Sequence, residues 1–226
     1  AMYHSKGLGR NTYSYYTEDL NKKVERRLAI EEQLHKALEL GEFKVFFQPQ
    51  VDLSNGSVMG AEALLRWDNK TLGSVSPMEF IPIAEHTGLI SELGAFVLEQ
   101  ALTKTAQWKR QYDQNFRIAI NLSPRQFREP SLVSRIEQLL KQTGVDSRSL
   151  ELEITEGVLM GGHPHIKEAL KQLSKQGINI AMDDFGTGYS SLSYLRSYPF
   201  HVLKIDRSFI RDIDVDQSDF ELVNAT

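Results

Sequence analysis

The feature that most constrains this fold is a regular alternation of short strands and helical patterns from residue 43 onward. Between the strand-like stretches, apolar residues recur at helical spacing. Strands that alternate with helices indicate parallel βαβ units. The stretches predicted as strands are Phe43–Val51, Val58–Trp67, Arg117–Leu122, Leu150–Thr155, Ile178–Asp183 and His201–Asp206.

Helix boundaries are marked by local signals. Residues 76–79, Ser-Pro-Met-Glu, form a capping box with proline at the first helical position, and the helix after it carries apolar residues at helical spacing through Trp108. Two later helical patterns end at Gly144 and Gly177. A further helix is expected from Thr17, which can cap it, to Gly41.

Side-chain alternation within the strands predicts where a site would lie. Successive strand residues point to opposite faces, so Leu152 and Glu153 lie on different sides of the sheet. Strand after strand offers one apolar face and a second face with polar residues towards its C-terminal end. This pattern favours a (β/α)8 barrel with an active site at its C-terminal mouth. A doubly wound sheet is the alternative, but it buries both faces against helices. Glu151 shares the parity of Glu153 at a deeper position, and we expect a cationic partner for it.

The polar residues at these strand ends predict a metal site. Asp183 and Asp184 stand side by side before the segment F-G-T-G, and adjacent like charges favour a bound cation. An ordinary acidic loop is the alternative reading of this pair alone. Oxygen ligands without His or Cys suit Mg²⁺ or Mn²⁺, and four carboxylates balance two divalent ions. Two such ions can promote in-line attack of water on a phosphodiester, with Lys204 orienting or helping to deprotonate that water. The residues collected at the mouth are Glu62, Asn121, Glu153, Asp183, Asp184, Lys204 and Asp206.

The composition narrows the class of protein. The chain has 226 residues, 41% hydrophobic and 25% charged, as in a soluble globular protein. It has no signal peptide, and its apolar runs are too short to span a bilayer. The absence of cysteine excludes disulfides and thiolate chemistry and fits a cytoplasmic protein. A net charge of −4 argues against broad nucleic-acid binding. His163-Pro164-His165 follows two glycines, and we interpret it as a solvated loop rather than a metal pair.

Seven short motifs together carry a family resemblance. They stand in one order along the chain: F-Q-P at 47–49, E-A-L at 62–64, F-I-P-I-A-E at 80–85, N-L-S at 121–123, E-I-T-E at 153–156, D-D-F-G-T-G at 183–188 and K-I-D at 204–206. With these motifs the chain resembles the EAL domains, a family of cyclic di-GMP phosphodiesterases. The resemblance runs from about Phe43 to the last residue.

The resemblance implies a fold, an activity and a set of site residues. The family fold is a TIM-like barrel whose first strand is antiparallel, and the implied reaction is metal-dependent hydrolysis of cyclic di-GMP to the linear dinucleotide pGpG. The alternative is a receptor that binds cyclic di-GMP without cleaving it. The implied ligands of two Mg²⁺ or Mn²⁺ ions are Glu62, Asn121, Glu153, Asp183 and Asp184. The implied catalytic residues are Glu62, Asp183 and Lys204. The implied substrate-binding residues are Gln48, Leu64, Arg66 and Asp206. Glu156 and Thr187 are expected to stabilise the loop after residue 185, and the family also implies a homodimer and a role in bacterial second-messenger signalling and biofilm control.

The chain also departs from the family pattern. Only six strands are counted where the barrel needs eight, and the family's A-E-G-V-E and Q-G-Y motifs are absent. Residues 42–226 are therefore expected to be a truncated EAL domain that hydrolyses very weakly or not at all by itself. Residues 1–16 resemble the end of a GGDEF domain, and residues 17–41 a connecting helix or the first helix of the domain. We expect no membrane contact by this segment, although upstream segments could anchor the parent protein.

Overall fold

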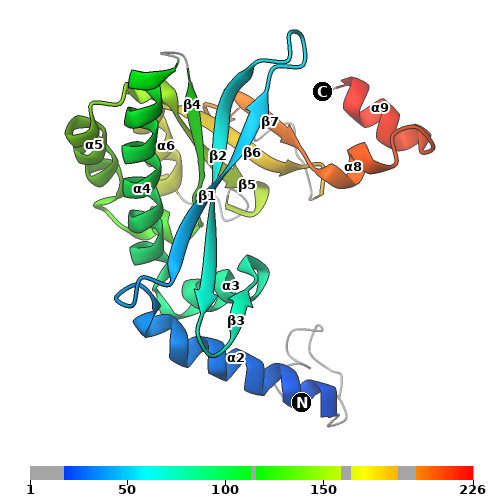
Figure 1. The fold of residues 1–226 in the computed structure, drawn as a ribbon. Coiled ribbons are helices and arrows are strands. Elements are labelled where there is room, and N and C mark those ends of the chain that lie inside the picture. Colours follow the sequence, from blue (N-terminus) through cyan, green and yellow to red (C-terminus); the bar gives the residue numbers. More distant parts are fainter. Residues whose placement is uncertain (1–17, 113–115, 159–163, 188–196, 226) are drawn as a thin grey trace. The chain divides into compact units, whose positions relative to one another are not determined.

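The computed structural model describes residues 18–225 apart from 113–115, 159–163 and 188–196 (Figure 1). The chain divides into two compact units. The smaller unit contains the N-terminal residues to Lys44 and the segment Arg66–Leu89, and the larger contains Val45–Leu65 and Ile90–Thr226.

The larger unit is built on a mostly parallel sheet. Its strands follow the order β1-β2-β4-β5-β6-β7, and each pair from β2 to β7 is parallel. All six predicted strands are confirmed to within two residues at each end. Their bounds are β1 Phe43–Val51, β2 Val58–Asn69, β4 Arg117–Asn121, β5 Leu150–Thr155, β6 Asn179–Phe185 and β7 Val202–Ile205.

The first strand runs antiparallel to the second, as predicted. β1 and β2 are neighbours in the sheet and are joined by a tight turn, in which Asp52 N donates to Ser57 O at 2.9 Å. Gly56 takes the left-handed conformation that this turn needs, with φ of 72°. A connection this short can join only antiparallel strands. Within the described residues the sheet is open, with β1 and β7 at its two edges, so the barrel is not closed.

Three helices cover one face of this sheet. α4 (Ile90–Gln111), α5 (Leu132–Thr143) and α6 (Pro164–Lys175) lie side by side in Figure 1. The outward strand residues pack beneath them and are almost fully buried: Ile118, Ile120, Leu150, Leu152, Ile154 and Ile180. The apolar parity predicted from the sequence is thus the helix-covered face, which leaves the other face for the polar residues.

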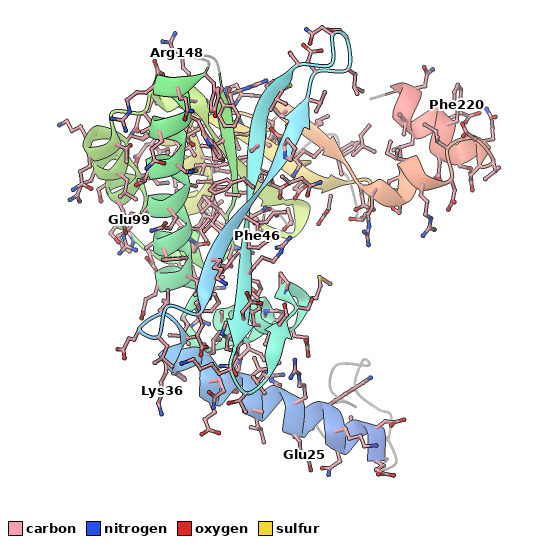
Figure 2. The ribbon with its side chains drawn as sticks, viewed as in Figure 1. Glu25, Lys36, Phe46, Glu99, Arg148 and Phe220 are labelled. Atoms are coloured by element: carbon pink, nitrogen blue, oxygen red, sulfur yellow. The ribbon has the colours of Figure 1, made fainter. Side chains whose placement is uncertain are left out.

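The C-terminal helices are less buried. α8 (Arg207–Arg211) and α9 (Gln217–Ala225) follow β7 and contain no buried residue. Phe220, labelled in Figure 2, keeps 48% of its surface exposed. Three short 3₁₀ turns complete the unit: η1 (Gln126–Arg128), η2 (Ser147–Ser149) and η3 (Glu156–Val158).

Two glycines end helices at the predicted positions, and a third ends a helix that was predicted to continue. Gly144 and Gly177 take left-handed conformations after α5 and α6, with φ of 69° and 88°. The single helix predicted from residue 77 to Trp108 is wrong, because Gly88 interrupts it with φ of 92°. Its N–H bonds to Ala84 O and ends α3 (Pro77–Thr87), and α4 starts separately at Ile90.

The smaller unit has its own aromatic core. α2 (Glu18–Ala37) contributes Ile30 and Leu34, and α3 begins at Ser76, whose side chain accepts from Met78 N. The rings of Phe43, Trp67 and Phe80 pack with centroids 5.5–5.7 Å apart. The strand β3 (Gly73–Val75) pairs with the end of β2 and was missed, since three residues carry too little pattern to predict a strand.

No helix among the described residues is both long enough and apolar enough to cross a membrane.

Candidate active site

The strand register brings the predicted site residues onto one face. Asn121 is the direct partner of Glu153 across β4 and β5, and Asp183 is paired with Thr155 across β5 and β6. Glu62 is paired with Ala119, two residues before Asn121 on the same side of β4. Four neighbouring strands therefore present one polar side chain each at adjacent positions.

Lys204 on β7 is the centre of this group. Its Nζ lies 2.7 Å from Glu153 Oε2, 3.2 Å from Asp183 Oδ1 and 3.4 Å from Glu62 Oε2. Burial alone would lower the pKa of Lys204, but the charges of Glu153, Asp183 and Glu62 outweigh it and raise that pKa above its usual value. Lys204 is therefore a firmly protonated ammonium, shared among three carboxylates.

Glu153 is the most buried member of the group. Its side chain is fully buried, and its Oε2 forms an ion pair with Lys204 Nζ at 2.7 Å, while Oε1 has no hydrogen-bond donor among the described residues. Burial raises the pKa of Glu153 to about 8, with Glu62 and Asp183 adding to the effect and Lys204 opposing it. A buried carboxylate oxygen without a partner is costly, and it marks a position where a further cationic or donor group would be stabilised.

Asn121 and Glu62 form the second contact of the site. Asn121 Nδ2 donates to Glu62 Oε1 at 2.7 Å, and the other oxygen of Glu62 faces Lys204. Both oxygens of this carboxylate therefore have a partner within the site. The pair links β2 to β4 at the point where β4 ends.

Asp184 has an unusual backbone. It is the only non-glycine residue with positive φ in the described chain, at 54°. Non-glycine residues in this region are strained and often mark functional sites. Thr187 helps to hold it, because its N and Oγ1 both donate to Asp184 O, at 3.3 and 2.9 Å. Burial, followed by the charges of Asp183 and Asp206, raises the pKa of Asp184.

The remaining predicted site residues are placed less closely together. Gln48 is exposed and Leu64 is half-buried. Arg66 belongs to the smaller unit, and the structure does not position it relative to this site. Asp206 caps α8: its Oδ1 accepts from Ser208 Oγ at 2.5 Å and from Ser208 N at 2.9 Å, and these bonds, the one from the hydroxyl first, lower the pKa of Asp206. Their substrate-binding roles stay predictions.

Two further expectations have different outcomes. The side chain of Glu156 lies outside the described residues, as does most of the loop that it was expected to hold. Glu151 is buried, and burial raises its pKa, opposed first by the positive charge of Arg117. Arg117 is thus the nearest match to the cationic partner that the sequence led us to expect.

The side-chain oxygens of the site are of the kind that bind hard cations. In this structure, however, they do not surround a position where a metal ion would lie. The candidate ligands are oxygens from Glu62, Glu153 and Asp183, with the amide of Asn121 beside them, and Mg²⁺ and Mn²⁺ prefer such ligands. The unpartnered Oε1 of Glu153 is consistent with a further ligand. No three His, Asp or Glu side chains in the described part of the chain form a group that could hold a metal ion directly. Lys204 Nζ instead lies among the carboxylates.

Sequence reasoning missed two residues beside the site, Gln126 and Gly94. Gln126 is buried in the turn that follows Asn121, and its side chain contacts α4 at Gly94. The signal was a glycine in a helix interior, which usually has a packing reason.

Comparison with known proteins places this geometry in a family. The EAL domain family model matches residues 31–226. The chain belongs to the EAL domain family. It is 39% identical over its whole length to the bifunctional diguanylate cyclase/cyclic di-GMP phosphodiesterase MucR of Pseudomonas aeruginosa, and 34% identical to the cyclic di-GMP phosphodiesterase PdeR of Escherichia coli. This EAL chain spans 33% and 34% of those two relatives.

The solved structures agree with the family and the fold. A PaMucR phosphodiesterase in complex with c-di-GMP superposes with a TM-score of 0.82 at 39% identity, covering 87% of this chain and 80% of that one. The structure of the EAL enzyme Bd1971 in its cGMP-bound form gives 0.84 at 34% identity, over 91% and 57%. The open sheet of this chain therefore corresponds to most of an EAL fold.

Proposed function

We propose that the intact protein to which this EAL domain belongs hydrolyses cyclic di-GMP to linear pGpG with the help of Mg²⁺ or Mn²⁺. The observation that carries the proposal is the position of Lys204 Nζ within 3.4 Å of three carboxylates from three strands. The names of two relatives and of one solved complex support the choice of cyclic di-GMP.

Each residue has a distinct task in the proposed reaction. Glu62, Asn121, Glu153 and Asp183 would hold one cation, and Asp183 with Asp184 a second. Bound cations would lower the pKa of water and neutralise charge on the phosphodiester. Water adds to the phosphorus as the P–O3′ bond breaks, so the ring opens with the water oxygen on the new 5′-phosphate and a proton on the leaving O3′. The Lys204 ammonium orients the water, and its positive charge stabilises the negative charge that develops during the reaction.

In this scheme the Lys204 ammonium and the bound cation contact the same carboxylates. Glu153 ionises only when positive charge is close, because its burial raises its pKa to about 8. An ammonium and a divalent cation together would supply that charge. The pKa of about 8 already includes the opposing charge of Lys204, so Lys204 would hold the carboxylates together and a bound divalent cation would complete the ionisation of Glu153.

The test is release of pGpG by the intact protein, followed by chromatography. Lys204→Ala should reduce turnover about 10²–10³-fold, the usual effect of removing one positioned group that stabilises charge in the transition state. Lys44→Ala is the matched control, since Lys44 pairs with Asp68 at 3.4 Å on the exposed surface, and it should leave turnover unchanged. Wild-type protein that binds cyclic di-GMP without releasing pGpG would overturn the proposal in favour of a receptor.

A further inference from the structure

The turn after β4 is held by one buried side chain, Gln126, of which 3% is exposed. Gln126 Oε1 accepts from Ser123 N at 2.9 Å, and Gln126 N donates to Ser123 O at 3.0 Å. These two bonds close residues 123–126 into a turn. Leu122, which precedes the turn, donates its N–H to Glu153 O at 2.9 Å. The turn is thus fixed directly beside Asn121.

Gly94 makes room for the Gln126 side chain on α4. Glycine in a helix interior is destabilising relative to alanine, and Gly94 is not among the glycines with positive φ, so its backbone gives no reason for it. A Cβ at this position would overlap Gln126 Nε2 and lie 2.8 Å from Cδ. The space taken by the carboxamide therefore accounts for the glycine.

Asn121 connects this packing to the site. It ends β4, one residue before Leu122, and its Nδ2 donates to Glu62 Oε1 at 2.7 Å. We propose that Gln126 is a positioning residue, which packs on α4 at Gly94 and fixes the turn so that the Asn121 amide meets Glu62. The proposal rests on the proposed function, because Asn121 and Glu62 are predicted ligands there.

Two variants of the intact protein separate this role from ordinary packing. Gln126→Met keeps the size of the side chain over Gly94 but removes the acceptor for Ser123 N. Gly94→Ala keeps Gln126 but takes its space. Each should weaken the affinity for Mn²⁺, titrated alone, by about 10-fold or more, because losing the groups that orient metal ligands typically costs about 10–100-fold in metal affinity. The same variants should raise KM for cyclic di-GMP or lower kcat.

Two controls decide what a negative result means. Ile166→Val in α6, a helix that packs against η1, trims a buried side chain of the same unit but leaves Gln126 and its bond to Ser123 N in place, and it should leave Mn²⁺ affinity unchanged. Asn121→Ala removes the side chain being positioned and should weaken Mn²⁺ affinity at least as much as Gln126→Met does.

The outcomes distinguish the two proposals. If Asn121→Ala weakens Mn²⁺ binding but Gln126→Met and Gly94→Ala behave like Ile166→Val, the positioning role is wrong and the proposed function stands. If wild type binds neither Mn²⁺ nor cyclic di-GMP, the proposed function is overturned and the positioning role with it. Weakened binding in both variants, with Ile166→Val unchanged, supports the proposal.

Discussion

Glu42 of the smaller unit and Glu153 of the larger are both buried, with 7% and 0% exposed, but their surroundings differ in kind. Glu42 Oε2 accepts from Trp67 Nε1 at 3.0 Å and from Asn69 Nδ2 at 2.8 Å. Glu153 faces an ammonium and two other carboxylates, and one of its oxygens has no described donor.

The pKa values of the two glutamates move in opposite directions. The hydrogen bond from Trp67 lowers the pKa of Glu42, with Asn69 adding to it and burial opposing. Burial raises the pKa of Glu153 to about 8. Neutral donors at fixed positions make a buried carboxylate part of the stable fold, whereas neighbouring charges leave it incompletely satisfied. Perturbed groups of the second kind are concentrated at functional sites.

The largest expected effect is the loss of turnover on Glu153→Gln. The amide keeps the shape of the side chain but removes a charge that the site needs to hold a cation in place, and we expect hydrolysis to fall about 10²-fold or more. The free energy of unfolding should stay the same or rise, because a poorly satisfied buried charge has been removed. Glu151→Gln, a deeper change on the same strand, is the control and should affect turnover less. Loss of both stability and turnover would place Glu153 in the same class as Glu42.

Glu42→Gln should have the opposite effects, lowering stability while leaving turnover unchanged. It weakens two charge-assisted hydrogen bonds in the smaller unit, so the free energy of unfolding should fall by about 1–3 kcal/mol. Turnover should be unchanged at temperatures where the variant is folded. Glu39→Gln in the exposed turn after α2 is the matched control. Urea denaturation measures the difference, and equal midpoints for the two variants would contradict this account of Glu42.

A smaller effect is the pH dependence of stability, measured in chelator by urea denaturation. Glu42 stabilises the fold above its ordinary pKa of 4.5, and this contribution is lost as pH falls through the lowered folded-state value. Glu153 ionises at about 8 when folded and at about 4.5 when unfolded, so its burial destabilises the fold increasingly between those values. The difference in the free energy of unfolding between Glu153→Gln and wild type should therefore grow from pH 4.5 to 8. The corresponding difference between wild type and Glu42→Gln should not grow over this range. A constant difference for Glu153→Gln would contradict its raised pKa.

Strand positions and the polar face were predictable because each depends on local alternation. Glu62, Asn121, Glu153 and Asp183 lie on one face because parallel strands in register align equivalent positions, which parity alone anticipates. The central position of Lys204 was not predictable, because it depends on side-chain reach across three strands. Lys204 was expected at the mouth beside the carboxylates and near the attacking water, but not as an ammonium shared by three of them.

Features that depend on contacts between distant residues were also missed. Nothing near Glu42 in the sequence indicates its bonds to Trp67 and Asn69, which are 25 and 27 residues away. Gly88 was passed over because apolar spacing continues on both sides of it, although its left-handed conformation divides α3 from α4. Such breaks depend on backbone geometry more than on periodicity.

The central claim is that the carboxylates around Lys204 form a cation-dependent site, and Mn²⁺-linked stability tests it most directly. At 100 times its dissociation constant, a ligand that binds only the folded state stabilises it by about 2.7 kcal/mol. Urea denaturation of wild type should shift by about that amount on adding saturating Mn²⁺, and Glu153→Gln should shift little. Equal stabilisation of the two proteins by Mn²⁺ would contradict the account, because the cation would then bind without Glu153.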